Sequence, residues 1–535
     1  MTPFDWTAGY PSRRSPLFAR NIVATSHPLA AQAGLGVLQA GGNAVDAAIA
    51  TAACMTLVEP CSNGLGSDAF CILWDGRQLH GLNASGPAPA AWTPGFFAGQ
   101  QAMPQRGWGS VTVPGAVGGW VALSERFGRL PFADLMQPAI AIAERGYALP
   151  PVVQGKWALA AALGELTSQP GFAPAFLPRG RVPEVGELFR FTDAARSLRL
   201  IAETRGEAFY RGEIAAALAH FARDTGGALT EADLAAYRPE WVTPLAQDFA
   251  GHTLHEIPPN GQGIAAQMAL GLLAHWDIAS HAVDGPEAQH LMIEAMKLAF
   301  ADVYRFVAEP AAMPVSAAQL LDPGHLAARA RLIDPARAQV FGAGNPVKGG
   351  TIYLTAADES GMMVSFIQSN YMGFGSGLVL PGYGISLQNR GHCFTLEAGH
   401  PNQVAPGKRP FHTIIPAFLT QDGAPVMSFG VMGGNMQPQG HLQTLVRMLS
   451  YGQNPQAACD APRWRFNEGL SINVEPHMPA ATLAGLQARG HEVGDIHDSY
   501  QDFGAGQFIW RLGDPGVDGY VAASDPRRDG AAVGW

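Results

Sequence analysis

The amino-acid sequence predicts an α+β fold in which β-sheets pack together and helices cover them. From about residue 115 to 340, apolar residues mostly recur at helical spacing, as at Leu291, Met292, Ala295 and Leu298. Beyond residue 350 the pattern changes to strands joined by tight turns, interrupted by two helices near 440–450 and 480–490. Separate runs of helices and of strands are typical of layered α+β folds.

The segment 21–60 predicts a strand followed by two helices. Gly41 and Gly42 end the first helix, because glycine readily adopts the positive φ of a helix C-terminus. Asn43 is expected to cap the second helix. A glycine-rich loop and a buried strand follow in 62–76, and no internal repeat is evident.

Composition excludes several classes of protein. With 535 residues, of which 47% are hydrophobic, the chain can bury a large core, and its formal charge of −10 argues against nucleic-acid binding. The longest apolar stretch, about 12 residues, is too short to span a bilayer, and the start of the chain has no signal-peptide pattern. The 5 cysteines lack CxxC spacing, as expected in a reducing compartment. We therefore expect a cytoplasmic protein without nucleic-acid or membrane partners.

Thr351 follows Gly349 and Gly350 directly and begins a predicted strand. A threonine hydroxyl is a poor nucleophile without a base beside it, and the residue's own free α-amine, with a pKa of about 8, is one such base. Exposing that amine requires cleavage of the Gly350–Thr351 bond, which the Thr351 hydroxyl can attack itself. The residues alone leave a second interpretation open, since a Gly-Gly turn before a strand-forming threonine is common.

Landmarks along the chain favour the first interpretation: GGNAVDAA, SVTVPGAVGGW, IPPNGQGI, GKRPFHTIIPAF, VMGGNMQPQGH and DAPRWRF, in this order. They resemble the γ-glutamyltransferase family of N-terminal-nucleophile hydrolases over nearly the whole chain. The resemblance implies a four-layer αββα sandwich. It also implies self-cleavage into a large subunit, 1–350, and a small subunit, 351–535, which begins with the threonine.

The same resemblance implies the catalytic residues. Thr351 would be the autoprocessing residue and nucleophile, with its α-amine as base, and the Ser369 hydroxyl would hydrogen-bond to it. Gly433 and Gly434 would supply the backbone N–H groups of an oxyanion hole. From the residues alone, Ser369 is an ordinary strand serine and the glycine pair is a tight turn. No cofactor is implied, and His392 beside Cys393 lacks the spaced partners of a metal site.

The residues that bind a glutamyl group in this family are replaced here. Ser85 stands where the family has an arginine, His412 and Thr413 replace a serine pair, Cys393 replaces an acid and Tyr371 replaces an asparagine. A zwitterionic glutamyl head would leave charges unpaired, each at a cost of about 1–3 kcal/mol. We therefore expect an amide hydrolase with a different acyl group.

Polar residues near these landmarks are the candidates for binding a small anionic substrate. The predicted substrate-binding residues are Tyr371, Asn389, Arg390, His412, Thr413 and Ser85, with Lys408 and Arg409 as further cations. His412 is not needed as the general base, because the Thr351 amine can fill that role. A packed histidine without a catalytic role is the alternative, and Cys393 has no identifiable partner that would make it a rival nucleophile.

The segments SNYMGFGSG and PFHTIIPAF resemble the branch of the family that contains oxamate amidohydrolases. The resemblance implies hydrolysis of oxamate to oxalate and ammonia in purine degradation, by two subunits from one precursor that can pair further as a dimer. Oxamate has a carboxylate and no amino group, which agrees with the loss of the acid at position 393. Two alternatives stay open: a γ-glutamyl hydrolase or transferase with an altered pocket, and an unprocessed, inactive relative that acts as a binding protein.

Overall fold

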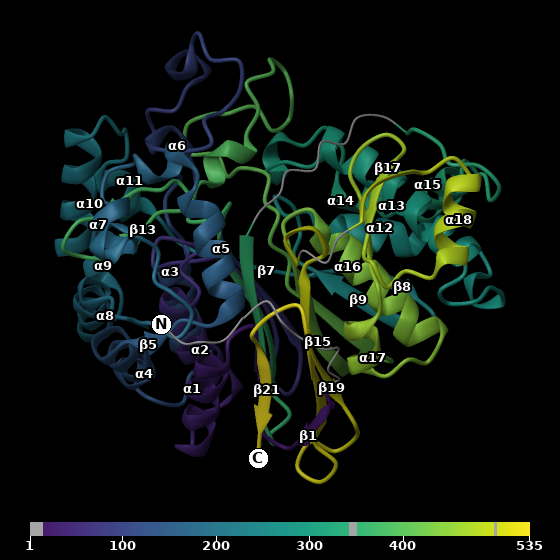
Figure 1. The fold of residues 1–535 in the computed structure, drawn as a ribbon, viewed down its shortest axis with the longest axis horizontal. Coiled ribbons are helices and arrows are strands. Elements are labelled where there is room, and N and C mark those ends of the chain that lie inside the picture. Colours follow the sequence, from purple (N-terminus) through teal and green to yellow (C-terminus); the bar gives the residue numbers. More distant parts are fainter. Residues whose placement is uncertain (1–13, 342–349, 497–499) are drawn as a thin grey trace.

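The computed structural model describes residues 14–341, 350–496 and 500–535. Within these ranges two seven-stranded antiparallel sheets stack face to face between two groups of helices (Figure 1). The β10 sheet has the order β21 (Ala531–Gly534), β2 (Ile22–Thr25), β10 (Gly350–Ala357), β11 (Met363–Tyr371), β3 (Asp68–Trp74), β4 (Leu79–Ala84) and β7 (Glu240–Val242). The β15 sheet has the order β1 (Leu17–Ala19), β20 (Tyr520–Ser524), β19 (Ala505–Arg511), β15 (Ala424–Met432), β14 (Ala417–Gln421), β9 (His252–Glu256) and β8 (Leu245–Phe249).

Each sheet is covered on its outer face by helices. Those on the β10 sheet are α1 (Pro28–Gln39), α2 (Ala44–Val58), α3 (Ala116–Phe127), α4 (Phe132–Arg145), α5 (Pro151–Ala161), α6 (Gly164–Thr167), α7 (Phe172–Phe176), α8 (Thr192–Thr204), α9 (Glu207–Arg211), α10 (Glu213–Asp224) and α11 (Glu231–Ala236). Those on the β15 sheet are α12 (Ile264–Leu273), α13 (Pro286–Phe306), α14 (Ala317–Leu320), α15 (Pro323–Ala330), α16 (Met436–Leu445), α17 (Pro455–Asp460), α18 (Ala480–Ala488) and α19 (Tyr500–Phe503). The predicted four-layer αββα sandwich is confirmed.

Smaller sheets complete the described structure. They are β5 (Tyr147–Ala148) with β6 (Leu188–Phe189), β12 (Val379–Leu380) with β13 (Ile385–Ser386), and β16 (Trp464–Phe466), β17 (Ser471–Val474) and β18 (Glu492–Ile496). One turn of 3₁₀ helix, Arg390–Cys393, follows β13. Strands joined by tight turns were expected beyond residue 350, and this segment forms a helical turn instead.

Three apolar cores hold the layers together. The core between the sheets includes Phe70, Ile72, Tyr353, Ile367 and Phe418, all fully buried. Each sheet also packs a separate apolar core against its own helices. Strand residues that alternate between two apolar cores are buried on both faces, which explains why β11 is buried along its whole length.

The first helices form as their residues predict. Asn43 caps α2 through a capping box, in which its side chain accepts from the Asp46 N–H at 3.0 Å and the Asp46 carboxylate accepts from the Asn43 N–H at 3.0 Å. Gly41 has φ of 91°, the conformation expected after the end of α1. These caps confirm the predicted boundary between the two helices.

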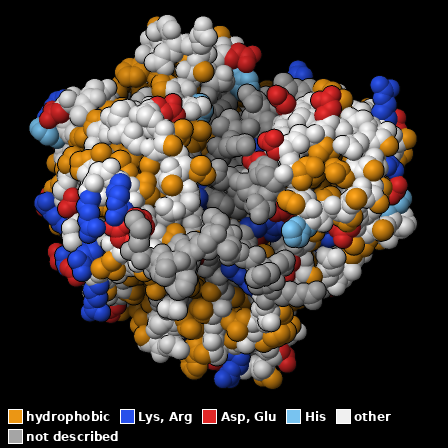
Figure 2. Space-filling model, viewed as in Figure 1, with side chains coloured by type: hydrophobic (Ala, Val, Ile, Leu, Met, Phe, Trp, Pro, Cys, Tyr) orange, Lys and Arg blue, Asp and Glu red, His pale blue; other side chains and the backbone are white. Residues whose placement is uncertain are grey.

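The prediction of a mostly helical region from 115 to 340 missed the two-residue strands β5 and β6 and three strands of the large sheets, β7, β8 and β9. The last three are short, only partly buried, and rich in polar residues, so hydrophobic periodicity gave no signal for them. β7 joins the β10 sheet, whereas β8 and β9 join the β15 sheet. Among the described residues no helix is long and apolar enough to cross a membrane. On the face in Figure 2, Lys and Arg side chains are interspersed with acidic ones.

Candidate active site

Thr351 is the second residue of β10 and is almost completely buried. Its Oγ1 donates a hydrogen bond to Ser369 Oγ on the neighbouring strand β11, at 3.2 Å. Ser369 Oγ also accepts from the Tyr371 N–H at 2.7 Å. Tyr371 has φ of 77°, so the chain leaves the strand conformation here and turns its N–H back onto the serine. The structure therefore brings together the two hydroxyl groups that the sequence analysis paired.

A β-bulge lies at the start of β10. Gly350 pairs with Tyr371, but Ile352 pairs with Gln368, and the register shifts between them. Bulges re-aim side chains and are common beside active sites. Here the bulge falls at the bond whose cleavage the sequence predicts. Gly349, the other glycine before Thr351, lies outside the described residues.

Gly433 and Gly434 form the turn between β15 and α16 and have φ of 125° and 62°, a region that favours glycine. The Gly433 carbonyl accepts from the Met436 N–H at 3.1 Å. Because C=O and N–H point in opposite directions across a trans peptide, the Gly434 N–H points away from the helix start. Within the described ranges neither glycine N–H donates to a protein acceptor. Two such donors at a helix N-terminus can bind a developing oxyanion.

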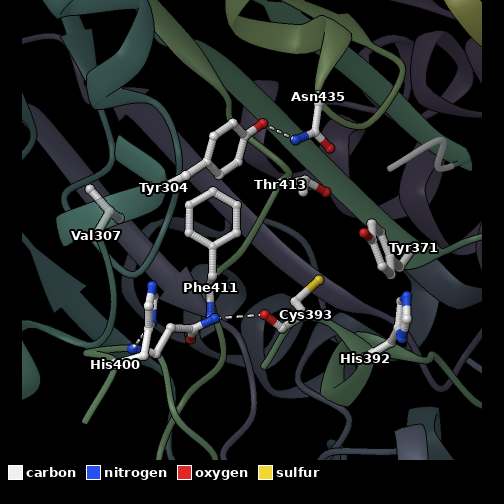
Figure 3. A pocket seen from close by; sticks show the side chains of 10 residues that line it. Tyr304, Val307, Tyr371, His392, Cys393, His400, Phe411, Thr413 and Asn435 are labelled. Atoms are coloured by element: carbon white, nitrogen blue, oxygen red, sulfur yellow. Dashed lines mark hydrogen bonds between the residues drawn. The ribbon is translucent and has the colours of Figure 1, made fainter. Parts of the chain in front are cut away.

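A cavity of about 140 Å³ lies beside these groups. Tyr371 and His392 form one wall, Tyr304 and Val307 lie opposite, and the Cys393 sulfur points into the space between them (Figure 3). The remaining lining residues are His400, Asn402, Phe411, Thr413 and Asn435. Of the predicted substrate-binding residues, Tyr371 and Thr413 line this cavity.

Arg390 lies directly behind the cavity wall and is completely buried. Its Nη1 donates to Thr413 Oγ1 at 2.8 Å, and its guanidinium carbon lies 4.7 Å from the centre of the Tyr371 ring. Burial lowers the pKa of the guanidinium from its ordinary value, while the nearby Cys393 and Asp68 side chains act to raise it. In the described part of the chain, Nε and Nη2 have no oxygen or nitrogen acceptor, and the Cys393 thiol is the remaining polar group that interacts with the guanidinium. A buried cation with unused donors is suited to bind a carboxylate.

His412 is not among the residues that line the cavity, and its Nε2 lies 3.2 Å from Asp68 Oδ2. Its Nδ1 accepts from the Ile414 N–H at 3.4 Å, so Nε2 carries the proton. Burial, with a smaller contribution from Arg390, holds the pKa of His412 well below its usual value. Burial raises the pKa of Asp68 to about 7, although Arg390 and the Gly115 N–H oppose the shift. This buried pair links β3 of the β10 sheet to the segment that precedes β14.

Two other predicted residues also serve the surrounding structure. Asn389 Oδ1 accepts from the Met372 N–H at 3.1 Å, and its Nδ2 donates to the Gln105 carbonyl at 2.9 Å. The Ser85 hydroxyl donates to Asn83 Oδ1 at 2.7 Å. Neither side chain is among those that line the cavity. Their assignment as substrate-binding residues stays a prediction.

Lys408 and Arg409 are engaged elsewhere. Lys408 Nζ donates to the Gln403 carbonyl at 2.9 Å, which fixes its own loop. Arg409 Nη1 lies 2.9 Å from a Glu240 oxygen, and its Nε donates to the Ser85 carbonyl at 3.2 Å. Of the three predicted cations, Arg390 is the one whose partners, Thr413 and Tyr371, line the cavity.

Several residues of the site were not predicted from the sequence. Gln437 Nε2 lies 3.5 Å from Thr351 Oγ1, and Gln262 Nε2 donates to the carbonyls of Thr413 at 2.6 Å and Gly434 at 2.9 Å. Both glutamines lie in recognised landmark segments, so those segments were the available signal. Asp68 lies in the glycine-rich segment 62–76, which was recognised, but nothing there indicates its pairing with His412. Tyr304 had no signal, because its helix shows an ordinary core pattern.

A set of possible metal ligands occurs elsewhere among the described residues. His290, Glu294 and His491 offer ligand atoms within 4.8 Å of one another. His290 Nδ1 is 2.8 Å from His491 Nε2, and Lys297 Nζ is 2.7 Å from Glu294 Oε1. The lysine already neutralises the carboxylate and the two imidazoles bond to each other, so the set carries no argument for a bound cation.

We compared the amino-acid sequence with those of known proteins. The family model described as gamma-glutamyltranspeptidase matches residues 30–535. The chain is 35% identical to the "Glutathione hydrolase-like YwrD proenzyme" of Bacillus subtilis, covering 97% of this chain and 99% of that protein. It is 36% identical to the "Oxamate amidohydrolase proenzyme" of Klebsiella pneumoniae, again covering 97% and 99%.

The fold also matches that of a solved structure over the whole chain. The crystal structure of cephalosporin acylase from Bacillus halodurans is similar with a TM-score of 0.95 and 46% identity, covering 100% of this chain and 99% of that one. The first two relatives are named proenzymes, one of them an amidohydrolase, and the third is named an acylase. Together the matches support a proenzyme amidohydrolase.

Proposed function

Because the chain belongs to the gamma-glutamyltranspeptidase family, we propose that it is a self-processing amidohydrolase for short acyl groups that end in a carboxylate. Oxamate, which the sequence analysis favoured, is the smallest substrate of this class. The hydrogen bond between Thr351 and Ser369 supports the reaction type. The unused donors of buried Arg390 support the substrate class, and they are the observation that carries it.

Self-processing would begin with attack of Thr351 Oγ1 on the Gly350 carbonyl carbon. The C–N bond of that peptide breaks, an ester forms, and the hydroxyl proton passes to the released α-amine. One water then hydrolyses the ester and leaves a carboxylate on Gly350. The products are a large subunit, 1–350, and a small subunit, 351–535, whose new N-terminal amine can act as a base near neutral pH.

Turnover would use the same atoms. Thr351 Oγ1 attacks the substrate amide carbon while its proton passes to the α-amine and then to the leaving nitrogen, so that ammonia or an amine departs. The carbonyl oxygen, now negative, would be stabilised by the N–H groups of Gly433 and Gly434. Water then gives a proton to the α-amine and attacks the ester. The acid leaves as the proton returns to Oγ1.

Arg390 would recognise the acyl group. A carboxylate in reach of Nε and Nη2 would form two charge-assisted hydrogen bonds with the planar guanidinium. The side chain is held ready for this by its bond to Thr413 and by the Tyr371 ring, so little of its conformational freedom is lost on binding. This makes a carboxylate a better partner for the site than a neutral acyl group.

A second candidate is an acylase that releases an amine larger than ammonia. The similarity in fold and sequence to a protein named cephalosporin acylase favours it. So does the cavity of about 140 Å³, which leaves room beyond an oxalyl group. Both candidates share Thr351 and Arg390, and they differ in the length of the acyl group and in the leaving amine.

The experiment combines intact mass spectrometry with a substrate panel. Fragments that meet between Gly350 and Thr351 are expected after incubation at neutral pH. The processed protein is then given oxamate, glutaryl and γ-glutamyl p-nitroanilides, and glutathione. Turnover of oxamate or the glutaryl amide supports the proposal. Turnover of the γ-glutamyl compounds alone would favour a γ-glutamyl hydrolase instead, and an unbroken, inactive chain would favour a binding protein.

A further inference from the structure

The side chain of Gln437 has a defined orientation next to the nucleophile. It lies in the first turn of α16, directly after the turn formed by Gly433 and Gly434, and is completely buried. Its Oε1 accepts from the Ile415 N–H at 2.9 Å. A backbone N–H can only donate, so the amide oxygen must face Ile415. The amide nitrogen then faces Thr351 Oγ1, at 3.5 Å.

This orientation gives the hydrogen bonds at the nucleophile a single direction. Gln437 Nε2 donates to Thr351 Oγ1, and Thr351 Oγ1 donates to Ser369 Oγ. The hydroxyl of Thr351 therefore has a fixed donor on one side and a fixed acceptor on the other. A hydroxyl that would otherwise rotate is held in one orientation.

The helix that carries Gln437 is itself fixed to the β15 sheet. His441, one turn further along α16, accepts from the Val431 N–H through Nε2 at 3.2 Å. Its Nδ1 donates to Glu256 Oε1 on β9 at 2.7 Å. Both contacts are completely buried. A side chain on this helix can thus be held at a constant distance from β10, as a catalytic group requires.

We propose that Gln437 is a further catalytic residue, whose amide N–H orients the Thr351 hydroxyl and stabilises negative charge on Oγ1. The proposal rests on the function proposed above. Charge develops on Oγ1 when the C–Oγ1 ester bond of the acyl-enzyme breaks, before the α-amine returns a proton to it. A neutral N–H donor at that oxygen helps the ester to leave without competing for the proton. It would act in the same way when the Gly350 ester of the precursor is hydrolysed.

Two substitutions of Gln437 distinguish the effect of its N–H donor from the effect of its packing. Gln437→Glu keeps an oxygen for Ile415 but replaces the donor with a negative oxygen near the Thr351 amine. That charge should raise the pKa of the amine and move the acidic limb of the kcat/KM profile upward by about one pH unit. Gln437→Met keeps the volume and removes the donor. It should lower kcat and the rate of self-processing about tenfold, the loss expected for one hydrogen bond, and leave the limb in place.

Gln439→Glu and Gln439→Met are the matched controls. Gln439 is buried on the same helix, but it bonds to the carbonyls of Asn435 and Phe466 and not to Thr351. Its variants should lose stability without moving the acidic limb. The proposal would be overturned if both Gln437 variants kept the wild-type kcat, processing rate and acidic limb. It would also be overturned if Gln439→Glu showed the same pH shift as Gln437→Glu.

Self-processing needs no added substrate, so it separates this inference from the substrate assignment. If the wild-type chain processes itself but hydrolyses none of the carboxylate amides, the substrate class is wrong. A tenfold slower processing of Gln437→Met would still support the role of Gln437. A wild-type chain that neither processes nor hydrolyses an amide would overturn both.

Discussion

Replacement of Arg390 by methionine should remove the preference for carboxylate-bearing acyl groups. The guanidinium is completely buried, so the free energy needed to strip it of water has already been spent in folding. Methionine fills a similar volume with no charge and no donor. The substitution therefore tests recognition of the carboxylate more directly than a change in the size of the cavity would.

The size of the expected loss of activity follows from the two Arg390 donors, Nε and Nη2, that have no oxygen or nitrogen acceptor. A hydrogen bond to a charged group contributes about 1.5–3 kcal/mol net, so two contribute at least about 3 kcal/mol. At about 1.4 kcal/mol for each factor of ten, kcat/KM for the carboxylate substrate should fall by more than about a hundredfold. A matched neutral substrate never gained these bonds and should lose little.

The assay compares pairs of substrates that differ in the terminal carboxylate. Oxamate is paired with pyruvamide, and the release of ammonia is measured. Glutaryl p-nitroanilide is paired with valeryl p-nitroanilide, and the release of nitroaniline is measured. Arg409→Met is the control variant, because Arg409 is paired with Glu240 and should leave the ratio of each pair unchanged.

An equal fall of kcat/KM for both members of each pair would refute the reasoning. It would mean that Arg390 supports the structure and does not contact substrate. Fragments that meet at the Gly350–Thr351 bond must be present in the variant, because loss of processing would remove activity for another reason. The ratio within each pair is the quantity that decides, since it cancels any difference in the amount of active enzyme.

Three further changes test the nucleophile and the buried carboxylates. Thr351→Ala should abolish processing and turnover together, as read by intact mass and amide hydrolysis, whereas Thr355→Ala on the same strand should retain both. Burial raises the pKa of Asp68 to about 7, so the folded state binds this proton more tightly than the unfolded state and stability falls by up to about 1.4 kcal/mol per unit as pH rises toward 7. Asp68→Asn should remove that slope in urea unfolding measured from pH 5 to 7, and an unchanged slope would contradict the assignment. Burial acts to raise the pKa of Asp525, but its two arginine partners outweigh this and lower it. Asp525→Asn should therefore cost about 3–5 kcal/mol at pH 7, and the loss should shrink as pH falls below about 4, where the unfolded chain takes up the proton first and the folded carboxyl only at a lower pH.

The fold could be predicted from the sequence where local residues determine a helix or a strand. The strands of 351–371 and the capped helices around Asn43 were recognisable because local residues determine them. The strands β7, β8 and β9 were not recognisable, because partners far along the chain select them. β9, for example, pairs with β14, whose residues lie more than one hundred and fifty positions later.

The site was predictable where one short segment contains all of its parts. Thr351 and Ser369 face each other across one hairpin, and Gly433 and Gly434 form one turn. Arg390 and His412 were both candidates from the sequence, and local patterns could not show which groups they contact. The structure pairs His412 with Asp68, from a strand more than three hundred residues earlier, and the role of Arg390 stays a proposal.

The charges around Arg390 also bear on the acyl group that the site can accept. The resemblance described above places Cys393 at the position of an acid, and its thiol interacts with the Arg390 guanidinium beside the cavity. An ammonium group placed there would face a cation about 4 Å away without a counter-charge, a repulsion of about 4 kcal/mol at the effective dielectric constant of a protein. A carboxylate in the same region would be attracted instead. Under the proposed function, the buried Arg390 and the uncharged thiol at position 393 therefore act in one direction, away from an amino acid and toward a simple dicarboxylic acid monoamide.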